Sequence, residues 1–432
     1  MLDKTVRFID LFAGIGGIRT GLSQALEDAG HTAVCVLASE IKPYATRVLQ
    51  DNYPQESIAG DVTQLDTSDI PDFDILCAGF PCQAFSSAGK RHGFADTRGT
   101  LFFEVERILR EKKPKGFFLE NVEGLVSHDN GKTLDVILTS LRALGYKVAY
   151  RVLNSRDFGV PQERKRIYIV GTFSTEPNLD NFSGSSKTVG DILEKGMPTE
   201  SSPFIDSLLS HYSVPELYGK SIKDKRGGGS NIHSWDLEIK GAVSPDQKML
   251  LNCMLRERRK KKWAEEIGIE WMDGMPLTLS QIRTFFPHPQ LGEMLEDLAC
   301  KGYLKYEHPK QKKTHTDLFG RSIAVREPDT SLPKGYNIVA GKLSFEISKV
   351  LDPADVAPTL VATDMQKLYV PDGEGLRRLT LREGLRLFGY PETMSLNVSE
   401  KEGFDLLGNT VVVPVIKAVS SRLITALNIP TT

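Results

Sequence analysis

The sequence predicts an α/β protein whose first half forms a mostly parallel sheet with helices on both faces. Three observations support this. Short apolar runs alternate with segments of helical periodicity between residues 1 and 173. A glycine-rich turn follows the first apolar run, and polar or reactive side chains directly follow the later ones. In such sheets, ligands bind beyond the carboxyl ends of the strands, so these side chains are the first candidates for a site.

The order of the apolar runs places each element. The runs are rich in β-branched and aromatic residues, whereas the segments between them repeat their apolar residues with helical spacing. We expect strands at 6–12, 31–40, 73–79, 116–122, 147–153 and 166–173, and helices at 18–29, 101–112 and 133–144.

Composition limits the class of protein. The chain has 432 residues, of which 40% are hydrophobic and 25% charged, and this excludes a mostly disordered chain. The net charge of −2 means that nucleic-acid binding would need local basic patches. The five cysteines form no C-x-x-C pair, so we expect neither a disulfide framework nor a metal site. No apolar stretch approaches about 18 residues and no signal peptide is seen, so we expect a cytoplasmic protein without a membrane partner.

The turn after the first strand is a candidate for ligand binding. Gly14, Gly16 and Gly17 allow a sharp turn and a close approach of a ligand to the backbone. Glu40 follows the second strand, where a carboxylate can accept hydrogen bonds from ribose hydroxyls. Asp61 lies at the same edge, although without other signals a turn or cap aspartate is the favoured interpretation. The pattern departs from G-x-G-x-x-G, which disfavours a nicotinamide oxidoreductase.

The third and fourth strands are followed by residues that could take part in a chemical reaction. Cys82 follows Pro81 beyond the strand, where a cysteine can act as a nucleophile. The glycine- and serine-rich loop after it could serve as a mobile lid. Glu120 ends the next strand and could protonate a ring nitrogen if its pKa is raised. Arg164 and Arg166 could hold Glu120 or a phosphate, or simply form a solvated strand entry.

Eight features occur in a fixed order along the chain. They are DLFAGIGG at 10–17, Glu40, Asp61, GFPCQAFS at 79–86, ENV at 120–122, QERKRIYIVG at 162–171, RRLTLREGLRLFGYPE at 377–392 and GNTVVVPVI at 408–416. In these features the chain resembles the DNA (cytosine-5)-methyltransferases of bacterial restriction–modification systems. The resemblance covers roughly 1–173 and 335–425. Thr410 stands where members of the family often carry Ser, and the hydroxyl is kept.

The resemblance implies a Rossmann-like, S-adenosylmethionine-dependent methyltransferase fold with a smaller, variable target-recognition domain. It implies a catalytic domain at 1–174, a recognition region at 175–335, and a return of the chain to the catalytic domain within 336–432. The last helix, near 411–427, would pack beside the glycine turn. The implied cofactor-binding residues are Phe12, Gly14, Gly16, Gly17, Glu40, Ile41, Asp61, Val62, Pro81, Leu101, Asn409 and Thr410.

The resemblance also implies a mechanism. Cys82 would attack C6 of a flipped-out cytosine, Glu120 would contact N3, and Arg164 and Arg166 would position Glu120 or the base. No residue stands out as the base that removes the C5 proton. The expected partners are double-stranded DNA and, functionally rather than physically, a cognate restriction endonuclease, with the enzyme a monomer. The expected DNA contacts are Gln83, Ser86, Ser87, Lys90, Arg91, Arg258, Lys261 and Lys312.

The middle region, 175–335, lacks the alternation of strands and helices seen in the first half of the chain. A capping box and a proline open a helix at residue 244, which we expect to run to about 267 and to carry many basic residues. These residues could contact phosphates or form a solvated helix face. Helices at 279–286 and 289–301, a strand at 303–306, a basic turn and a strand at 322–327 follow. This is the order of a winged helix, so we expect a winged-helix-like DNA-binding insert at 244–327, or else a helical packing unit.

Two other functions stay open on the sequence alone. A tRNA cytosine-5 methyltransferase would use the same catalytic residues, although the long recognition region argues against it. The other is a catalytically inert DNA-binding homologue. Such a protein would not need Pro81, Cys82, Glu120 and Arg166, so their presence argues against it.

Overall fold

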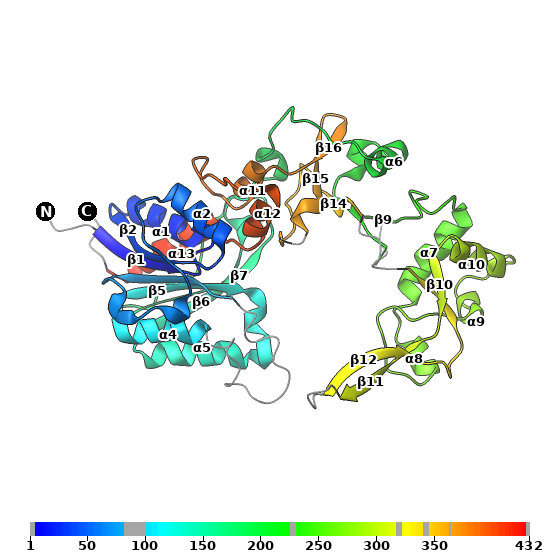
Figure 1. Ribbon diagram of the computed structural model, residues 1–432, viewed down its shortest axis with the longest axis horizontal. Coiled ribbons are helices and arrows are strands. Elements are labelled where there is room, and N and C mark those ends of the chain that lie inside the picture. Colours follow the sequence, from blue (N-terminus) through cyan, green and yellow to red (C-terminus); the bar gives the residue numbers. More distant parts are fainter. Residues whose placement is uncertain are drawn as a thin grey trace. The chain divides into compact units, whose positions relative to one another are not determined.

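The chain forms two compact units in a computed structural model (Figure 1). The structure describes residues 5–81, 101–224, 230–316, 322–339, 345–362 and 364–428. The first unit comprises 1–197, 352–366 and 378–432, and the second comprises 198–351 and 367–377. The first unit therefore runs beyond residue 174, and the chain returns to it near residue 352, within the expected range 336–432.

A seven-stranded sheet is the centre of the described part of the first unit, in the order β3-β2-β1-β4-β5-β7-β6. The first five strands in this order are parallel, and β7 is antiparallel to both β5 and β6. The strands are β1 (Thr5–Leu11), β2 (Thr32–Ser39), β3 (Ile58–Ala59), β4 (Ile75–Gly79), β5 (Gly116–Val122), β6 (Lys147–Asn154) and β7 (Lys165–Thr172). The predicted α/β fold and its six strands are confirmed.

Helices cover both faces of this sheet. Figure 1 shows α1 and α13 on one side and α4 and α5 on the other. The helices of this unit are α1 (Gly17–Asp28), α2 (Pro43–Asn52), α4 (Leu101–Lys112), α5 (Lys132–Ala143), α11 (Leu381–Leu387), α12 (Glu400–Gly408) and α13 (Val413–Ala426). Neither α2 nor the short β3 was predicted, because β3 is only two residues long and α2 buries only three side chains.

The C-terminal helix α13 packs against α1, as the resemblance implies. Gly21 of α1 makes this contact possible, because a Cβ at this position would lie 2.6 Å from Cβ of Ile416 and 2.9 Å from the backbone nitrogen of Lys417. The stretch from Glu400 to Ala426 is long and apolar enough for a membrane span. However, 67% of the 18-residue apolar window within this stretch is buried inside the protein. Burial of this kind is typical of core helices.

Replacing Gly21 with Ala is expected to destabilise the protein by about 1–3 kcal/mol, because the new methyl group overpacks the contact with α13. The measurement is the free energy of unfolding from urea denaturation. Gly292→Ala is the matched control, since Gly292 is also helical and its added Cβ would meet no atom within 4 Å. That change should stabilise the helix by up to about 1 kcal/mol. Equal effects of the two substitutions would contradict the proposed packing role.

The described residues of the second unit form two apolar clusters. One includes Ile205, Leu208, Val350 and Tyr369 and lies around helix α6 (Pro203–His211) and a five-stranded sheet in the order β16-β15-β14-β8-β9. The strands of this sheet are β8 (Ser221–Ile222), β9 (Asn231–Ile232), β14 (Lys349–Val350), β15 (Leu368–Asp372) and β16 (Gly375–Arg378).

The other cluster is the core of residues 235–338, the region for which a winged-helix-like insert is expected. The elements are α7 (Pro245–Glu257), α8 (Lys262–Glu266), α9 (Leu279–Arg283), α10 (Leu291–Cys300), β10 (Leu304–Glu307), β11 (Lys310–Thr316), β12 (Ser322–Pro328) and β13 (Gly335–Ile338). Strand β10 pairs with β13. Leu277 extends this small sheet through an antiparallel backbone bridge to Tyr336. Strands β11 and β12 form the protruding hairpin, or wing.

Two sequence predictions in this region were wrong. The helix expected from residue 244 to about 267 breaks after Glu257, because Arg258 turns inward and its Nη1 donates to Oδ1 of Asn337 at 2.8 Å. The expected basic turn after β10 instead contains β11, whose exposed polar residues lack the apolar alternation of a half-buried strand.

Candidate active site

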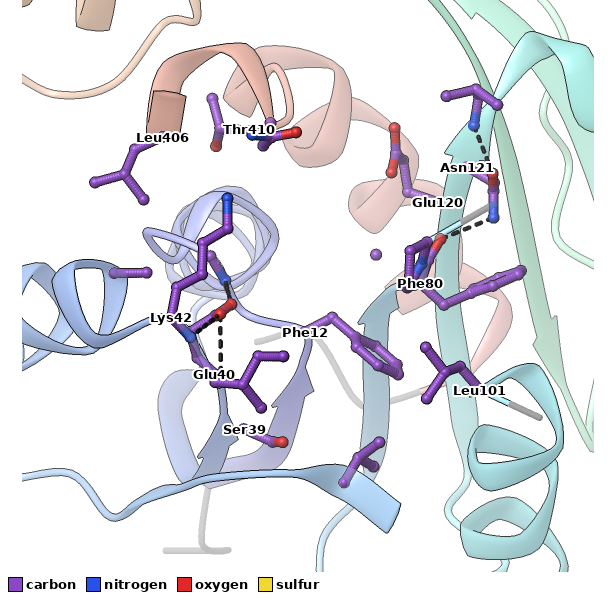
Figure 2. Close-up of a pocket in the computed structure, with 18 of the residues that line it drawn as sticks. Phe12, Ser39, Glu40, Lys42, Phe80, Leu101, Glu120, Asn121, Leu406 and Thr410 are labelled. Carbon is purple, nitrogen blue, oxygen red and sulfur yellow. Dashed lines mark hydrogen bonds between the residues drawn. The ribbon is translucent and has the colours of Figure 1, made fainter. Parts of the chain in front are cut away.

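A cavity of about 640 Å³ opens at the carboxyl ends of β1, β2, β4 and β5. This volume is typical of pockets for drug-sized ligands. Figure 2 shows Glu40 and Lys42 on one side, Glu120 and Asn121 on the other, and Phe12 between them. The predicted residues that line the cavity are Phe12, Gly14, Glu40, Ile41, Asp61, Val62, Pro81, Leu101, Glu120, Arg164, Arg166, Asn409 and Thr410.

Backbone donors fix the carboxylate of Glu40. Its Oε2 accepts a hydrogen bond from the backbone N–H of Gly14 at 2.8 Å, and its Oε1 accepts from the N–H groups of Ile41 and Lys42 at 2.9 and 2.8 Å. A carboxylate oxygen has two lone pairs, so Oε2 can accept another donor from the cavity. The carboxylate is thus oriented by its own strand end and by the glycine turn.

The turn itself has unusual backbone geometry. Phe12 has φ 57°, in the left-handed region that non-glycine residues rarely adopt, and its ring lies in the cavity (Figure 2). Strained backbone of this kind often marks functional sites. Asp61 caps the turn Val62–Gln64 by accepting the N–H of Thr63 on Oδ1 at 2.9 Å. Asp61 is thus a cap residue that also lines the cavity, so the two readings of it are compatible.

Gly16 and Gly17 were expected to bind the cofactor but do not line the cavity. Gly16 has φ 81° and precedes α1 as its N-cap. A Cβ on Gly17 would lie 2.6 Å from Oη of Tyr390 and from Cγ2 of Val411. The two glycines therefore shape the turn and let the C-terminal segment approach it.

Glu120 lies at the far side of the cavity and is buried, with 8% of its surface exposed. Burial raises the pKa of its carboxyl group, and the nearby Arg166 and Arg164 oppose this shift. Nε of Arg166 lies 3.2 Å from Oε1 of Glu120. The site therefore combines a carboxyl group that holds its proton more tightly than usual with a cation that orients it.

Arg164 has a different position from the one predicted. Its guanidinium donates to the backbone oxygens of Leu360, Thr410 and Gly408, at 2.8, 2.8 and 3.3 Å. Burial lowers the pKa of this guanidinium to about 10. The two terminal nitrogens of Arg164 donate to these carbonyls and hold the C-terminal segment at the site, whereas its Nε has no hydrogen-bond partner among the described residues. Among these residues, Arg166 is the arginine that pairs with Glu120.

The C-terminal segment completes the cavity at Asn409 and Thr410. The hydroxyl of Thr410 is hydrogen-bonded to that of Tyr390 at 2.6 Å, and Nδ2 of Asn409 donates to the backbone oxygen of Asp405 at 2.8 Å. These contacts fix the segment that links α12 to α13. The proximity of these residues to the glycine turn, almost 400 positions earlier in the chain, could not be derived from periodicity.

Several predicted residues lie outside the described part of the chain. They are Cys82, Gln83, Ser86, Ser87, Lys90 and Arg91. Pro81 and Leu101, which flank the undescribed residues 82–100, both line the cavity. The chain therefore enters and leaves this segment beside the site.

Sequence reasoning did not assign roles to Asn121 and Lys42, which both line the site. Nδ2 of Asn121 donates to the backbone oxygen of Phe80 at 2.9 Å and so fixes the segment just before Cys82. Lys42 lines the cavity, and its Nζ pairs with Asp405 at 2.8 Å. The position of Asn121 beside Glu120 at a strand end was the available signal for its role, whereas Lys42 had none.

The basic residues expected to contact DNA in the middle region differ in exposure. Lys261 and Lys312 are exposed, but Arg258 is buried, with 5% of its surface accessible. A phosphate contact requires an accessible guanidinium, so the prediction for Arg258 was wrong. Its hydrogen bond to Asn337 gives it a structural role.

Comparison with known proteins gives the family. The model of the C-5 cytosine-specific DNA methylases matches residues 6–425. The Type II methyltransferases M.NlaIV of Neisseria lactamica and M.NgoBV of Neisseria gonorrhoeae are 61% and 59% identical to this chain, each over 98% of it and 99% of the relative. The Dnmt2 methyltransferase of S. pombe, 19% identical over 98% of this chain and 99% of its own, shares the fold with a TM-score of 0.53. The chain therefore belongs to the C-5 cytosine-specific DNA methylase family and is a DNA (cytosine-5)-methyltransferase.

Proposed function

We propose that this enzyme transfers a methyl group from S-adenosylmethionine to C5 of a flipped-out cytosine in a short, specific DNA sequence, through a covalent bond between Cys82 and C6. The observation that supports this most strongly is the arrangement of the cavity. The buried carboxyl group of Glu120 is at one side, and the oriented carboxylate of Glu40 is at the other.

The residues of the cavity fit S-adenosylmethionine. Oε2 of Glu40 keeps a lone pair for a ribose hydroxyl, and the ring of Phe12 offers an apolar face. Asp61 uses only Oδ1 as a cap, so Oδ2 can accept from the adenine amine. Ile41, with 72% of its surface exposed, supplies an apolar wall beside Glu40. When bound there, S-adenosylmethionine supplies an electrophilic methyl group.

The chemistry begins with Cys82, because C5 of cytosine is itself a poor nucleophile. The thiolate of Cys82 forms a bond to C6, and the displaced electron pair makes C5 enamine-like. C5 would then form its bond to the methyl group as the bond between that methyl and the sulfonium sulfur of S-adenosylmethionine breaks, and the electron pair of the broken bond would stay on the sulfur, giving S-adenosylhomocysteine. Loss of the C5 proton restores the C5–C6 double bond and breaks the bond to sulfur, which regenerates the thiolate.

Glu120 assists the first of these steps. Its raised pKa favours the protonated form, which can donate to N3 of cytosine as electrons move toward the ring nitrogen. Arg166 keeps the carboxyl group in place through its contact with Oε1. Asn121 holds the backbone of Phe80 and thereby the approach to Cys82.

The target base has to leave the duplex to reach these groups. A second hollow of about 350 Å³ adjoins the first, and both are lined by Val122 and Arg166. Lys165 also lines it and offers a second cation to the backbone of a flipped nucleotide, beside the carboxylates of Glu123 and Glu163. The loop at 84–99 would close over the base, although it lies outside the described residues.

The relatives named above are Type II methyltransferases, which suggests the biological setting. The enzyme would be the modification component that protects cellular DNA from a cognate restriction endonuclease. It would act in the cytoplasm as a monomer, because methylation of one base at a time needs no symmetric partner.

Covalent trapping tests this proposal. Duplex fragments in which 5-fluorocytosine replaces cytosine should form a denaturation-resistant adduct with the enzyme only when S-adenosylmethionine is present, because fluorine cannot leave C5 as a proton does. Ordinary duplex DNA is the control. An adduct with 5-fluorocytosine tRNA but not with DNA would favour the tRNA methyltransferase, and no adduct with either would overturn the covalent mechanism.

A further inference from the structure

Helix α10 occupies the position of a recognition helix but has the wrong charge for DNA. In helix-turn-helix proteins, the second helix of the pair lies in the major groove. The ten residues of α10 include three acidic residues, Glu293, Glu296 and Asp297, and no lysine or arginine. Glu293 and Glu296 are exposed. Duplex DNA carries one negative charge per about 1.7 Å, so this face would be repelled by the phosphates.

Whereas α10 is acidic, one face of the wing is basic. In the antiparallel pair β11–β12, Lys312 is opposite Arg326 and Lys310 is opposite Pro328. Opposite residues share a face of a hairpin, so these three basic side chains lie together. The other face carries Lys313 and His315, and both pair with Glu327, at 3.5 and 2.7 Å. Arg326 pairs with Glu270 at 3.6 Å, so among the described residues of the wing Lys310 and Lys312 carry the positive charge that is available to a partner.

The basic face of the wing lies next to the turn that joins α7 to α8, residues 258–261. Nη2 of Arg326 donates to the backbone oxygen of Trp271 at 3.1 Å, and the indole nitrogen of Trp271 donates to the backbone oxygen of Arg259 at 3.0 Å. Lys261 follows two residues later and is exposed, like Trp271. Figure 1 shows the hairpin close to α8.

We define the wing surface as Lys261, Trp271, Lys310, Lys312 and Arg326. Within the described part of the chain, neither Lys261 nor Lys312 has a carboxylate at ion-pairing distance, whereas the neighbouring Arg259 and Lys260 pair with Asp273 and Glu257. The two lysines on this surface are therefore available to phosphates.

We propose that residues 245–338 dock on duplex DNA through the wing surface, with Lys261 and Lys312 on phosphates and the acidic face of α10 turned away from the duplex. The inference rests on the proposed DNA substrate and adds a second contact, separate from the cavity that takes the base. Because its groups recognise the sugar–phosphate backbone, this contact contributes affinity that does not depend on sequence.

The test compares neighbouring lysines on opposite faces of one strand. Binding of the full-length enzyme to duplex DNA is measured by fluorescence anisotropy over a series of salt concentrations. Lys312→Gln should reduce the slope of log K against log[salt] by about 0.9, the value for one phosphate contact, and Lys261→Gln with Lys312→Gln by about 1.8. Lys313→Gln, the matched control, should leave the slope unchanged. Unaltered S-adenosylmethionine binding confirms that each variant is folded.

Two results would overturn the inference. One is an equal slope for Lys312→Gln and Lys313→Gln in an enzyme that still methylates DNA. The other is a larger effect of Glu293→Gln than of Lys312→Gln, which would place α10 at the DNA. Failure of the proposed function is distinct, because the native chain would then transfer no methyl group to DNA under any salt condition.

Discussion

Replacing Cys82 with Ser is expected to abolish methyl transfer, with a loss of at least about a thousandfold in the single-turnover rate. A serine hydroxyl is far less acidic than a thiol, so it supplies too little of the anionic nucleophile to add to C6. Binding of S-adenosylmethionine should persist, because Cys82 is not among the predicted cofactor-binding residues. The measurement combines transfer of a labelled methyl group to DNA with calorimetric binding of S-adenosylmethionine.

Cys77 provides a control for this substitution. It lies five residues earlier, is fully buried in β4, and has no proposed role in the reaction. Cys77→Ala should lower stability through the small cavity that it creates, while folded protein keeps its methyl-transfer rate. Transfer by Cys82→Ser within about tenfold of the native rate would contradict the role of Cys82 as nucleophile.

Replacing Glu120 with Gln is expected to slow methyl transfer by about 10²–10⁴-fold, the usual contribution of a general acid. The amide keeps the shape of the side chain but cannot pass a proton to N3. Burial raises the pKa of Glu120, so the native enzyme keeps the protonated form to a higher pH than an exposed glutamic acid would. Its rate should therefore fall as the pH rises through this raised pKa, and the fall should be absent in Glu120→Gln.

The measurement is the single-turnover rate as a function of pH for both proteins. Glu106→Gln is the control, because Glu106 pairs with Arg110 of α4 and lines neither hollow of the site, so the change should affect neither the rate nor its pH dependence. If Glu120→Gln kept the descending limb of the profile, another group would be the acid.

The sheet and its site edge could be predicted because they depend on local patterns. Apolar runs such as those of β4 and β5 are buried up to their last residue, and a parallel sheet brings the residues at their carboxyl ends together. The positions of Glu40 and Glu120 follow from this rule alone, whereas Asp61 follows the short strand β3, which was not predicted. The approach of Asn409 and Thr410 does not, and it was available only through resemblance to a family.

The features that were missed depend on partners distant in the sequence. Arg164 and Arg166 are separated by one residue, yet one binds three carbonyls from distant segments and the other binds Glu120. Arg258 breaks a helix to reach Asn337, 79 positions later. Periodicity and charge describe a residue's neighbours along the chain, so they cannot distinguish such cases.

The most direct test of this account is base-resolution methylation sequencing of DNA from a host that lacks its own cytosine methylation. The host would express the native chain or its Cys82→Ser variant. The account predicts 5-methylcytosine at one position of a short recurring sequence with the native chain, and none with the variant. Unmethylated DNA in cells that contain folded native protein able to bind S-adenosylmethionine would contradict it.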